Sequence, residues 1–301
     1  MKKIIIVGGT GLIGSNLARM LADEGFEIVI LTRNAVKYNS SGRIQYVSSD
    51  YRDEKGLSLI INGAYSVINL AGAGIAEKRW TADYKKLIYD SRINSTIALV
   101  NAMNNTENPP ESFISSSAIG IYGNRGDDVI DENSETADSF LAKVCSDWEN
   151  ESHKIRSEIR LINPRIGVVL SMEGGALPKL SQPFKFFAGG SVGSGKQWVS
   201  WIHIYDICRM FLQCINNKSY HGVINFTGPN PVTMKQLAVA IGKTMNRPAF
   251  FNVPEFAIKM LLGESAEMVL DSQKVLPKYA SENDFEFEFP NIREALDDLF
   301  K

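Results

Sequence analysis

Short apolar runs alternate with stretches of helical spacing along the first 170 residues. Between the runs, apolar residues recur every three or four positions after Gly14, over Leu87–Met103 and over Phe140–Ile155. Strands that alternate with helices form a parallel sheet with helices on both faces. The pattern therefore predicts an α/β chain with a doubly wound parallel sheet, a Rossmann fold. The runs expected to be strands are Lys3–Val7, Phe26–Thr32, Ile44–Val47, Ser66–Leu70, Ser112–Ser115 and Arg160–Leu170.

The pattern is less regular after residue 170. Residues 171–200 are rich in Gly, Ser and Lys and are expected to leave the sheet. Apolar spacing then predicts a helix over Tyr205–Asn216 and a strand over Gly222–Thr227. Thr233 and Gln236 have the spacing of a capping box, which predicts a helix that ends near residue 245. A last helix is expected over Asn291–Phe300, with its apolar residues on one face.

These elements suggest two units. Residues 1–170 plus 203–227 are expected to form the Rossmann core. Residues 171–202 plus 228–301 are expected to form a small C-terminal α/β lobe. We expect this lobe to cap the carboxyl ends of the strands, because open α/β sheets bind their ligands there.

Three glycines, Gly8, Gly11 and Gly14, lie between the first predicted strand and the first predicted helix. Residues without Cβ let a pyrophosphate approach the backbone, and the helix N-terminus offers free N–H groups and a positive dipole end. A glycine triplet alone is often only a turn, but a strand before it and a helix after it favour a dinucleotide site. The loop residues expected to contact the cofactor are Gly8, Thr10, Gly11, Leu12, Ile13 and Gly14.

Composition excludes several classes of function. The formal net charge of −2 shows no electrostatic footprint for nucleic acid. No apolar segment approaches the roughly 18 residues of a membrane span, and the N-terminal apolar run ends at Gly8 without a cleavage site. Three cysteines without a CxxC pair favour reduced thiols. We expect a cytoplasmic protein with a small-molecule substrate, no metal and no membrane or nucleic-acid partner; a homodimer stays open.

The end of the second strand indicates which dinucleotide binds. In NAD-specific sites an acidic residue about 20 positions after the glycines holds the ribose 2′-hydroxyl. No carboxylate occurs from Thr32 through Ser49, whereas Arg33, Lys37 and Arg43 do. A guanidinium grips a 2′-phosphate in bidentate fashion. The alternative is a solvated surface arginine, but the missing acid favours NADP, with Thr32 and Arg33 as contacts.

The chain resembles the extended and atypical short-chain dehydrogenase/reductase superfamily. More narrowly, it resembles the NAD(P)-dependent epimerase-like family with a C-terminal domain of unknown function. Besides the glycine loop, Ser49-Asp50, Asn69-Leu-Ala-Gly72, Ser115-Ser-Ser-Ala118 and Trp201-Ile-His-Ile-Tyr-Asp206 carry the broader resemblance. The narrower one rests on Arg79-Trp-Thr81, Asp90-Ser-Arg-Ile93, Cys145-Ser-Asp-Trp-Glu149, Pro164-Arg-Ile-Gly-Val-Val-Leu170 and Gln273-Lys-Val-Leu-Pro-Lys278.

This resemblance implies further cofactor contacts. Asp50 matches the residue that faces the adenine amino group, and the loop Leu70, Ala71 and Gly72 passes under the cofactor. Arg92 matches a family contact on the long helix, and Val169 lies where the sixth strand meets the nicotinamide end. Each has a simpler alternative: a turn-forming Asp, close packing of the loop, a surface charge and a core valine.

The usual acid–base pair of this superfamily is missing. Typical members use Tyr-x-x-x-Lys, in which the lysine lowers the pKa of the tyrosine. Only Tyr51 has a lysine four residues later, Lys55, and that pair lies in the wrong crossover. The expected helix has no tyrosine, and its Lys143 is out of register.

Replacement groups are few. Tyr122 follows the fifth strand within reach of the nicotinamide region, and we take it with Ser117 as the candidate catalytic residues. Ser116 is a further hydroxyl that would bond a substrate oxygen. His203 is a lone histidine, which is more often a packed structural residue than a catalyst.

Gly190-Ser-Val-Gly-Ser-Gly-Lys196 has the spacing of a phosphate loop. A working loop needs Ser or Thr next and joins a strand to a helix. Gln197 follows instead, and residues 198–202 are expected to be extended. We therefore reject a kinase or ATPase; related epimerases line the substrate pocket with this region.

Two hypotheses remain. The first is an NADP-dependent oxidoreductase or epimerase-like enzyme that acts on a small polar substrate, which the capping lobe favours. The second is a non-catalytic NADP-binding sensor or regulatory protein, which the missing Tyr-x-x-x-Lys pair favours.

Overall fold

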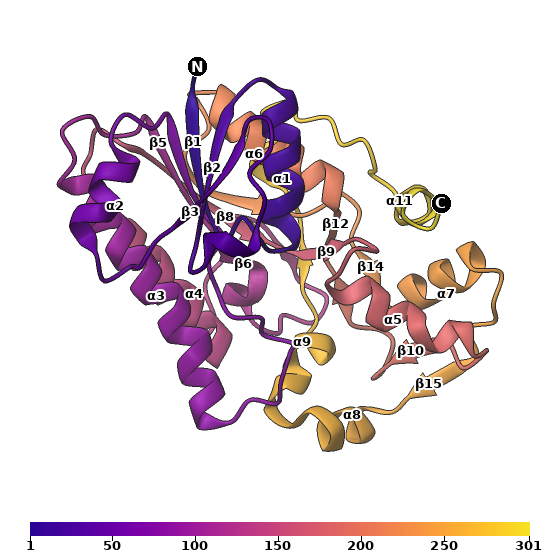
Figure 1. The fold of residues 1–301 in the computed structure, drawn as a ribbon. Helices are drawn as coiled ribbons and strands as arrows, with labels where there is room; N and C mark the ends of the chain where they lie inside the picture. Colours follow the sequence, from indigo (N-terminus) through magenta and orange to yellow (C-terminus); the bar gives the residue numbers. More distant parts are fainter.

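The computed structural model describes residues 1–301, and its centre is a parallel sheet (Figure 1). Its long strands run in the order β13-β8-β5-β4-β1-β2-β3, and the short β6 (Ser117–Ala118) also pairs with β8. This is the doubly wound Rossmann arrangement that the alternating pattern predicted. The long strands are β1 Lys3–Val7, β2 Glu27–Thr32, β3 Ile44–Ser48, β4 Ser66–Asn69, β5 Ser112–Ser115, β8 Arg160–Ile166 and β13 Gly222–Phe226.

Helices cover both faces of the sheet because its strands are apolar on both sides; in β1 all of Ile4–Val7 are fully buried. Side chains of α1 (Leu12–Asp23) and α6 (Ile204–Asn216) pack with one face. Those of α2 (Glu54–Ile61) and α3 (Ala82–Asn104) pack with the other. Helix α4 (Phe140–Ser152) lies against α3 (Figure 1). No helix is long and apolar enough to cross a membrane.

The predicted strand over Arg160–Leu170 is two strands. They are separated by Gly167, where an added Cβ would lie 2.6 Å from the carbonyl oxygen of Ser200. Strand β9 (Val168–Leu170) leaves the large sheet and pairs in parallel with β12 (Trp201–His203). The prediction of one continuous strand was wrong because this break depends on a contact with a distant segment.

The lobe has its own apolar core, in which Trp201, Leu177, Phe184, Leu237 and Leu296 are all buried. Two pairs of short strands contribute, one parallel (β10–β15) and one antiparallel (β11–β14). The predicted capping box at the start of α7 is present. The lobe contains α5 Ala176–Lys185, β10 Gly190–Val192, β11 Trp198–Val199, β14 Val232–Thr233, α7 Met234–Thr244, β15 Phe251–Val253, α8 Glu255–Leu262, η3 Gly263–Ala266, α9 Glu267–Leu270 and α11 Ile292–Leu299.

One part of the expected lobe lies on the Rossmann core instead. Strand β16 (Lys274–Val275) pairs with β7 (Val129–Ile130), which follows the 3-10 helix η2 (Ile119–Tyr122). Helix α10 (Lys278–Glu282) buries Ala280 in the main core. The lobe prediction of 228–301 therefore needs correction: residues 272–289, the return segment, cross back over the core. A short 3-10 helix, η1 (Ala35–Lys37), follows β2.

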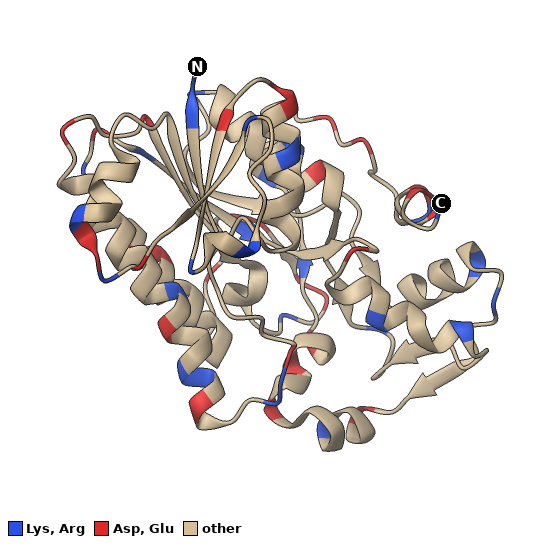
Figure 2. Cartoon of the chain, viewed as in Figure 1, with Lys and Arg blue, Asp and Glu red and all other residues tan.

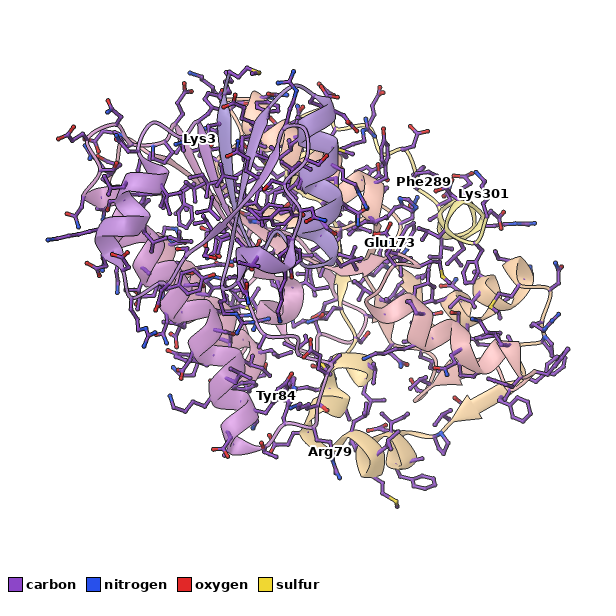
Figure 3. The ribbon with its side chains drawn as sticks, in the orientation of Figure 1. Lys3, Arg79, Tyr84, Glu173, Phe289 and Lys301 are labelled. Atoms are coloured by element: carbon purple, nitrogen blue, oxygen red, sulfur yellow. The ribbon has the colours of Figure 1, made fainter.

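Polar contacts also join the lobe to the core. Glu173, just before α5, accepts hydrogen bonds from Asn16 and Arg19 of α1 (Figure 3). Arg79, in the segment after β4, donates to the carbonyl of Met260 in α8 (Figure 3). These contacts place the lobe at the carboxyl edge of the sheet, as the sequence led us to expect.

Candidate functional site

The β1–α1 loop is shaped by close backbone contacts. Gly8 has φ of +78°, and an added Cβ would lie 2.6 Å from the backbone of Leu70 in the loop after β4. A Cβ on Gly14 would lie 2.5 Å from the carbonyl oxygen of Gly8. These two positions need glycine for the fold itself, because the obstructing atoms belong to rigid backbone.

Gly11 is different. Its φ of −82° and ψ of 177° suit any residue, and its added Cβ would meet only one atom, the Gly8 oxygen at 3.4 Å. Gly11 and Thr10 are exposed on the outer side of the loop. Neither packing nor backbone conformation requires a glycine here. The absence of a side chain keeps the surface above the loop clear for another molecule.

The start of α1 presents unsatisfied donors beside Gly11. The first helical hydrogen bond runs from the Ser15 N–H to the Gly11 oxygen, and no side chain caps the helix. The N–H groups of Leu12, Ile13 and Gly14 therefore have no protein partner. Three free donors at a helix N-terminus, under an open glycine, match what a pyrophosphate needs.

The carboxyl end of β2 carries a free cation. Arg33 is exposed and forms neither an ion pair nor a side-chain hydrogen bond, and Thr32 lies half-buried before it. Lys37 in η1 is also exposed at this edge. Arg43 precedes β3, and its carbonyl accepts from Ile28 near the start of β2. Arg43 therefore lies at the edge of the sheet opposite Arg33 and Lys37.

Asp50 follows β3 at the same edge as Arg33. Both of its carboxylate oxygens accept from Arg52, and Oδ1 also accepts from the Arg52 backbone N–H. These bonds lower the pKa of Asp50 to about 2. The contacts are those of a turn-forming aspartate, and the exposed carboxylate keeps acceptor capacity for a base amino group.

The loop after β4 lies directly beside the glycine loop. The Leu70 N–H donates to Val7 in β1, and Ala71 is held by the side chain of Asn69, a residue that sequence reasoning missed. The guanidinium of Arg92 lies against Gly72, whose added Cβ would be 2.9 Å from its Cζ.

Arg92 is not the surface charge that its sequence alone favoured. It is half-buried, stacks over Trp148 and donates to the carbonyls of Ala73 and Ile88. Burial lowers the pKa of this guanidinium. No carboxylate pairs with it; Nη1 makes both of its hydrogen bonds, and Nε and Nη2 have no partner. An unpaired, partly desolvated cation at this edge suits a polar or anionic ligand.

The expectation that Tyr122 lines the cleft was wrong. Its side chain is fully buried in η2, and its hydroxyl donates to Asn225 Oδ1 (2.8 Å) and accepts from Arg165 (2.9 Å). Arg165 also forms two hydrogen bonds with Glu149, which is buried as well. Sequence spacing did not reveal this network because its members come from four elements.

The serines after β5 remain without partners. The hydroxyls of Ser115, Ser116 and Ser117 are buried and form no hydrogen bond with the protein. Lys143, in contrast, is exposed and pairs with Asp147, so it does not replace the missing lysine. Buried hydroxyls without partners usually have a ligand, a water molecule or a mechanistic role.

Val169 lies half-buried in the middle of β9, and a Cβ added to Gly175 would lie 3.5 Å from its carbonyl oxygen. His203 is structural, in agreement with the simpler expectation. Its Nδ1 accepts from the Tyr205 N–H at the start of α6, and its ring stacks on Phe289 with centroids 4.0 Å apart.

The Gly190–Lys196 segment does not form a phosphate loop. It joins β10 to β11 with no helix between them, and the buried Gln197 donates to the carbonyls of Val192 and Val269. A cavity of about 550 Å³ lies next to it, between the core and the lobe. Its lining is mostly polar and includes Asn124, Ser194, Glu267 and Asp271. No cluster of side chains suitable for a metal ion is present.

Comparison with known proteins identifies the family. Residues 4–225 match the NAD dependent epimerase/dehydratase family, and residues 253–299 match a domain of unknown function, DUF1731. The chain belongs to the NAD dependent epimerase/dehydratase family.

Relatives of this family span nearly the whole chain. The chloroplastic SDR39U1 homolog of Arabidopsis thaliana is 39% identical over 97% of this chain and 85% of its own length. The epimerase family protein YfhF of Bacillus subtilis is 37% identical over 98% and 97%. A crystal structure of the human epimerase family protein SDR39U1 with NADPH superimposes with a TM-score of 0.90 at 27% identity, over 99% and 98% of the two chains.

Proposed function

We propose that this protein is an NADP-dependent oxidoreductase or epimerase-like enzyme that acts on a small polar substrate. Gly11 carries the proposal, because the protein itself has no need of glycine there. The free N–H groups of α1 supply the partners for a pyrophosphate. The human relative whose structure contains NADPH supports the same class of cofactor.

Arg33 favours NADP over NAD. Its guanidinium is free and exposed at the carboxyl end of β2, where a 2′-phosphate would lie. Residues 32–49 contain no acidic residue that would hold the ribose 2′-hydroxyl of NAD.

When bound, the dinucleotide would supply or accept a hydride. Arg92, beside Gly72, would bind its polar groups near the β1 and β4 loops. The free hydroxyls of Ser116 and Ser117 would orient a substrate oxygen after β5. The cavity of about 550 Å³ has a polar lining that suits hydroxylated or otherwise polar molecules; this lining includes Asn124, shortly after η2, but neither serine.

Titration of the purified protein with NADPH and NADH tests the cofactor assignment. We expect tighter binding of NADPH, and we expect Arg33→Glu to remove most of the difference. A charge-assisted hydrogen bond contributes about 1.5–3 kcal/mol, which corresponds to roughly ten- to a hundredfold in affinity. Arg43→Glu, at the opposite edge of the sheet, is the matched control. Equal affinities for the two nucleotides in the wild type would refute the assignment.

The alternative is a sensor that binds NADP without catalysis. It is favoured by the burial of Tyr122, since this removes the best phenolic proton donor from the cleft. A panel of carbonyl compounds with NADPH separates the two functions, with Ser117→Ala as the variant. Turnover that falls in Ser117→Ala at unchanged NADPH affinity supports the enzyme. No turnover on any compound, together with an NADPH-dependent change in binding to a protein partner, supports the sensor.

A further inference from the structure

Large apolar side chains gather on the outer rim of the lobe. We define the apolar rim as Phe186, Phe250, Phe251, Phe256, Met260 and Leu261. Each of these side chains is between 57% and 86% exposed. They come from the end of α5, from β15 and its preceding residue, and from α8, which form the edge of the lobe away from the large sheet (Figure 1).

The elements of the apolar rim have little other packing. Helix α8 buries only Ile258, although most of its residues are apolar. Strand β15 is exposed at every residue and pairs on one side only, with β10. Leu59, in contrast, is the one large apolar residue of α2 that is exposed. A contiguous exposed apolar patch marks an interaction surface, whereas single exposed residues need no explanation.

Basic residues outnumber acidic ones in the two segments that carry the apolar rim. Over residues 176–202 and 228–262, lysine and arginine outnumber acidic residues seven to one, although the whole chain carries a net charge of −2. Lys185 is adjacent to Phe186, and Lys259 lies on α8, where it pairs with the single acidic residue, Glu255. Figure 2 shows basic and no acidic positions on α5 and α7.

One aromatic contact shows how charge and apolar surface combine. The guanidinium of Arg247 lies 4.5 Å from the ring centroid of Phe187, which is itself 58% exposed. Phe187 has φ of +58°, a left-handed conformation that is rare for a bulky residue. Aromatic rings beside lysine and arginine are characteristic of side chains at the boundary between water and lipid.

The charge decides which partner fits. A second copy of the chain would place one basic rim against another and desolvate like charges, which is unfavourable. An anionic bilayer offers both an apolar interior for the phenylalanines and a negative surface for the lysines. We propose that the apolar rim binds the surface of an anionic lipid bilayer as a peripheral contact. This revises the sequence-based expectation of no membrane partner, which rested on the absence of a spanning segment.

Co-sedimentation with vesicles tests the proposal on the full-length protein. We expect binding to phosphatidylcholine vesicles that contain 30% phosphatidylglycerol, and little binding to phosphatidylcholine alone. The triple substitution Phe250→Ser, Phe251→Ser and Phe256→Ser should weaken binding at least about tenfold. Each of Lys185→Ala and Lys259→Ala should weaken it about fivefold, and rising salt should act in the same direction.

Two controls separate this proposal from the others. Leu59→Ser on α2 and Leu87→Ser on α3 remove exposed apolar residues of the core helices and should leave vesicle binding unchanged. Circular dichroism and NADPH titration show whether each variant is folded, and vesicle binding by the wild type does not depend on the cofactor proposal. Absence of binding to anionic vesicles would overturn the proposal. So would a dimer, seen by sedimentation velocity, that the triple phenylalanine variant dissociates.

Discussion

At the scale of the residue, the glycines of the β1–α1 loop have different reasons to be glycine. Gly8 and Gly14 face backbone atoms at 2.5–2.6 Å, so any side chain there would displace the loop. A Cβ on Gly11 would make only one ordinary contact, with the Gly8 oxygen at 3.4 Å. The sequence does not distinguish the three glycines, whereas the structure shows that packing requires Gly8 and Gly14 and does not require Gly11.

Gly11→Val and Gly14→Val should therefore behave differently. Gly11→Val should abolish NADPH binding and change the free energy of unfolding by no more than about 0.5 kcal/mol, as at other unobstructed surface sites. Gly14→Val should destabilise the fold by several kcal/mol because its Cβ meets the Gly8 oxygen. Thermal unfolding and NADPH titration on both variants measure the two effects. Normal NADPH binding by Gly11→Val would reduce the motif to a structural turn.

At the scale of the element, the buried network of Tyr122 connects η2 to strands β8 and β13 and helix α4. Arg165 contributes from β8, Asn225 from β13 and Glu149 from α4. A buried arginine–carboxylate pair is maintained only when its remaining donors and acceptors are satisfied. The tyrosine hydroxyl satisfies one such donor, so its role is to hold the segment after β5 in place.

Tyr122→Phe should accordingly affect stability rather than cofactor binding. It leaves one buried donor of Arg165 and the Asn225 oxygen without their partner, at a cost of about 1–3 kcal/mol. Chemical denaturation should show this loss, and NADPH affinity should stay unchanged. Tyr205→Phe, at a half-exposed tyrosine without a hydroxyl partner, should cost almost nothing. Loss of turnover without loss of stability would return Tyr122 to the catalytic residues.

At the scale of the whole molecule, the return segment 272–289 joins the two units. Glu288 and Phe289 donate their backbone N–H groups to the fully buried Asp206 at the start of α6. Phe289 stacks on His203 (Figure 3). The Nε2 atom of His203 lies 3.5 Å from a carboxylate oxygen of Asp298 in α11. One histidine thus lies where the core, the return segment and the last helix meet.

This position predicts a pH dependence of stability. Burial lowers the pKa of His203 below its ordinary value of 6.5, although Asp206 and Asp298 oppose the shift. As the pH falls through about 6.5, His203 is protonated in the unfolded chain but stays neutral in the folded chain. The free energy of unfolding therefore decreases as the pH falls below about 6.5. His203→Asn retains a cap for α6 and should flatten this dependence between about pH 6.5 and 5. Equal slopes in the wild type and His203→Asn would contradict the prediction.

The sequence by itself determined the features that depend on neighbouring residues along the chain. The parallel strands, the long helices, the capping box at Thr233 and the glycine loop all follow from local spacing, since burial on both faces and helix capping are short-range requirements. Only the tertiary structure decided the break at Gly167, the burial of Tyr122, the partial burial of Arg92, the path of the return segment and the apolar rim. Each of these depends on segments far apart in sequence: the Ser200 carbonyl lies against Gly167, Arg165 on β8 hydrogen-bonds to Tyr122, and exposed apolar residues between Phe186 and Leu261 lie along one edge. The pattern of neighbouring residues does not predict such contacts. The free energy of burying a polar group depends on the hydrogen-bond partners that folding brings to it from distant segments.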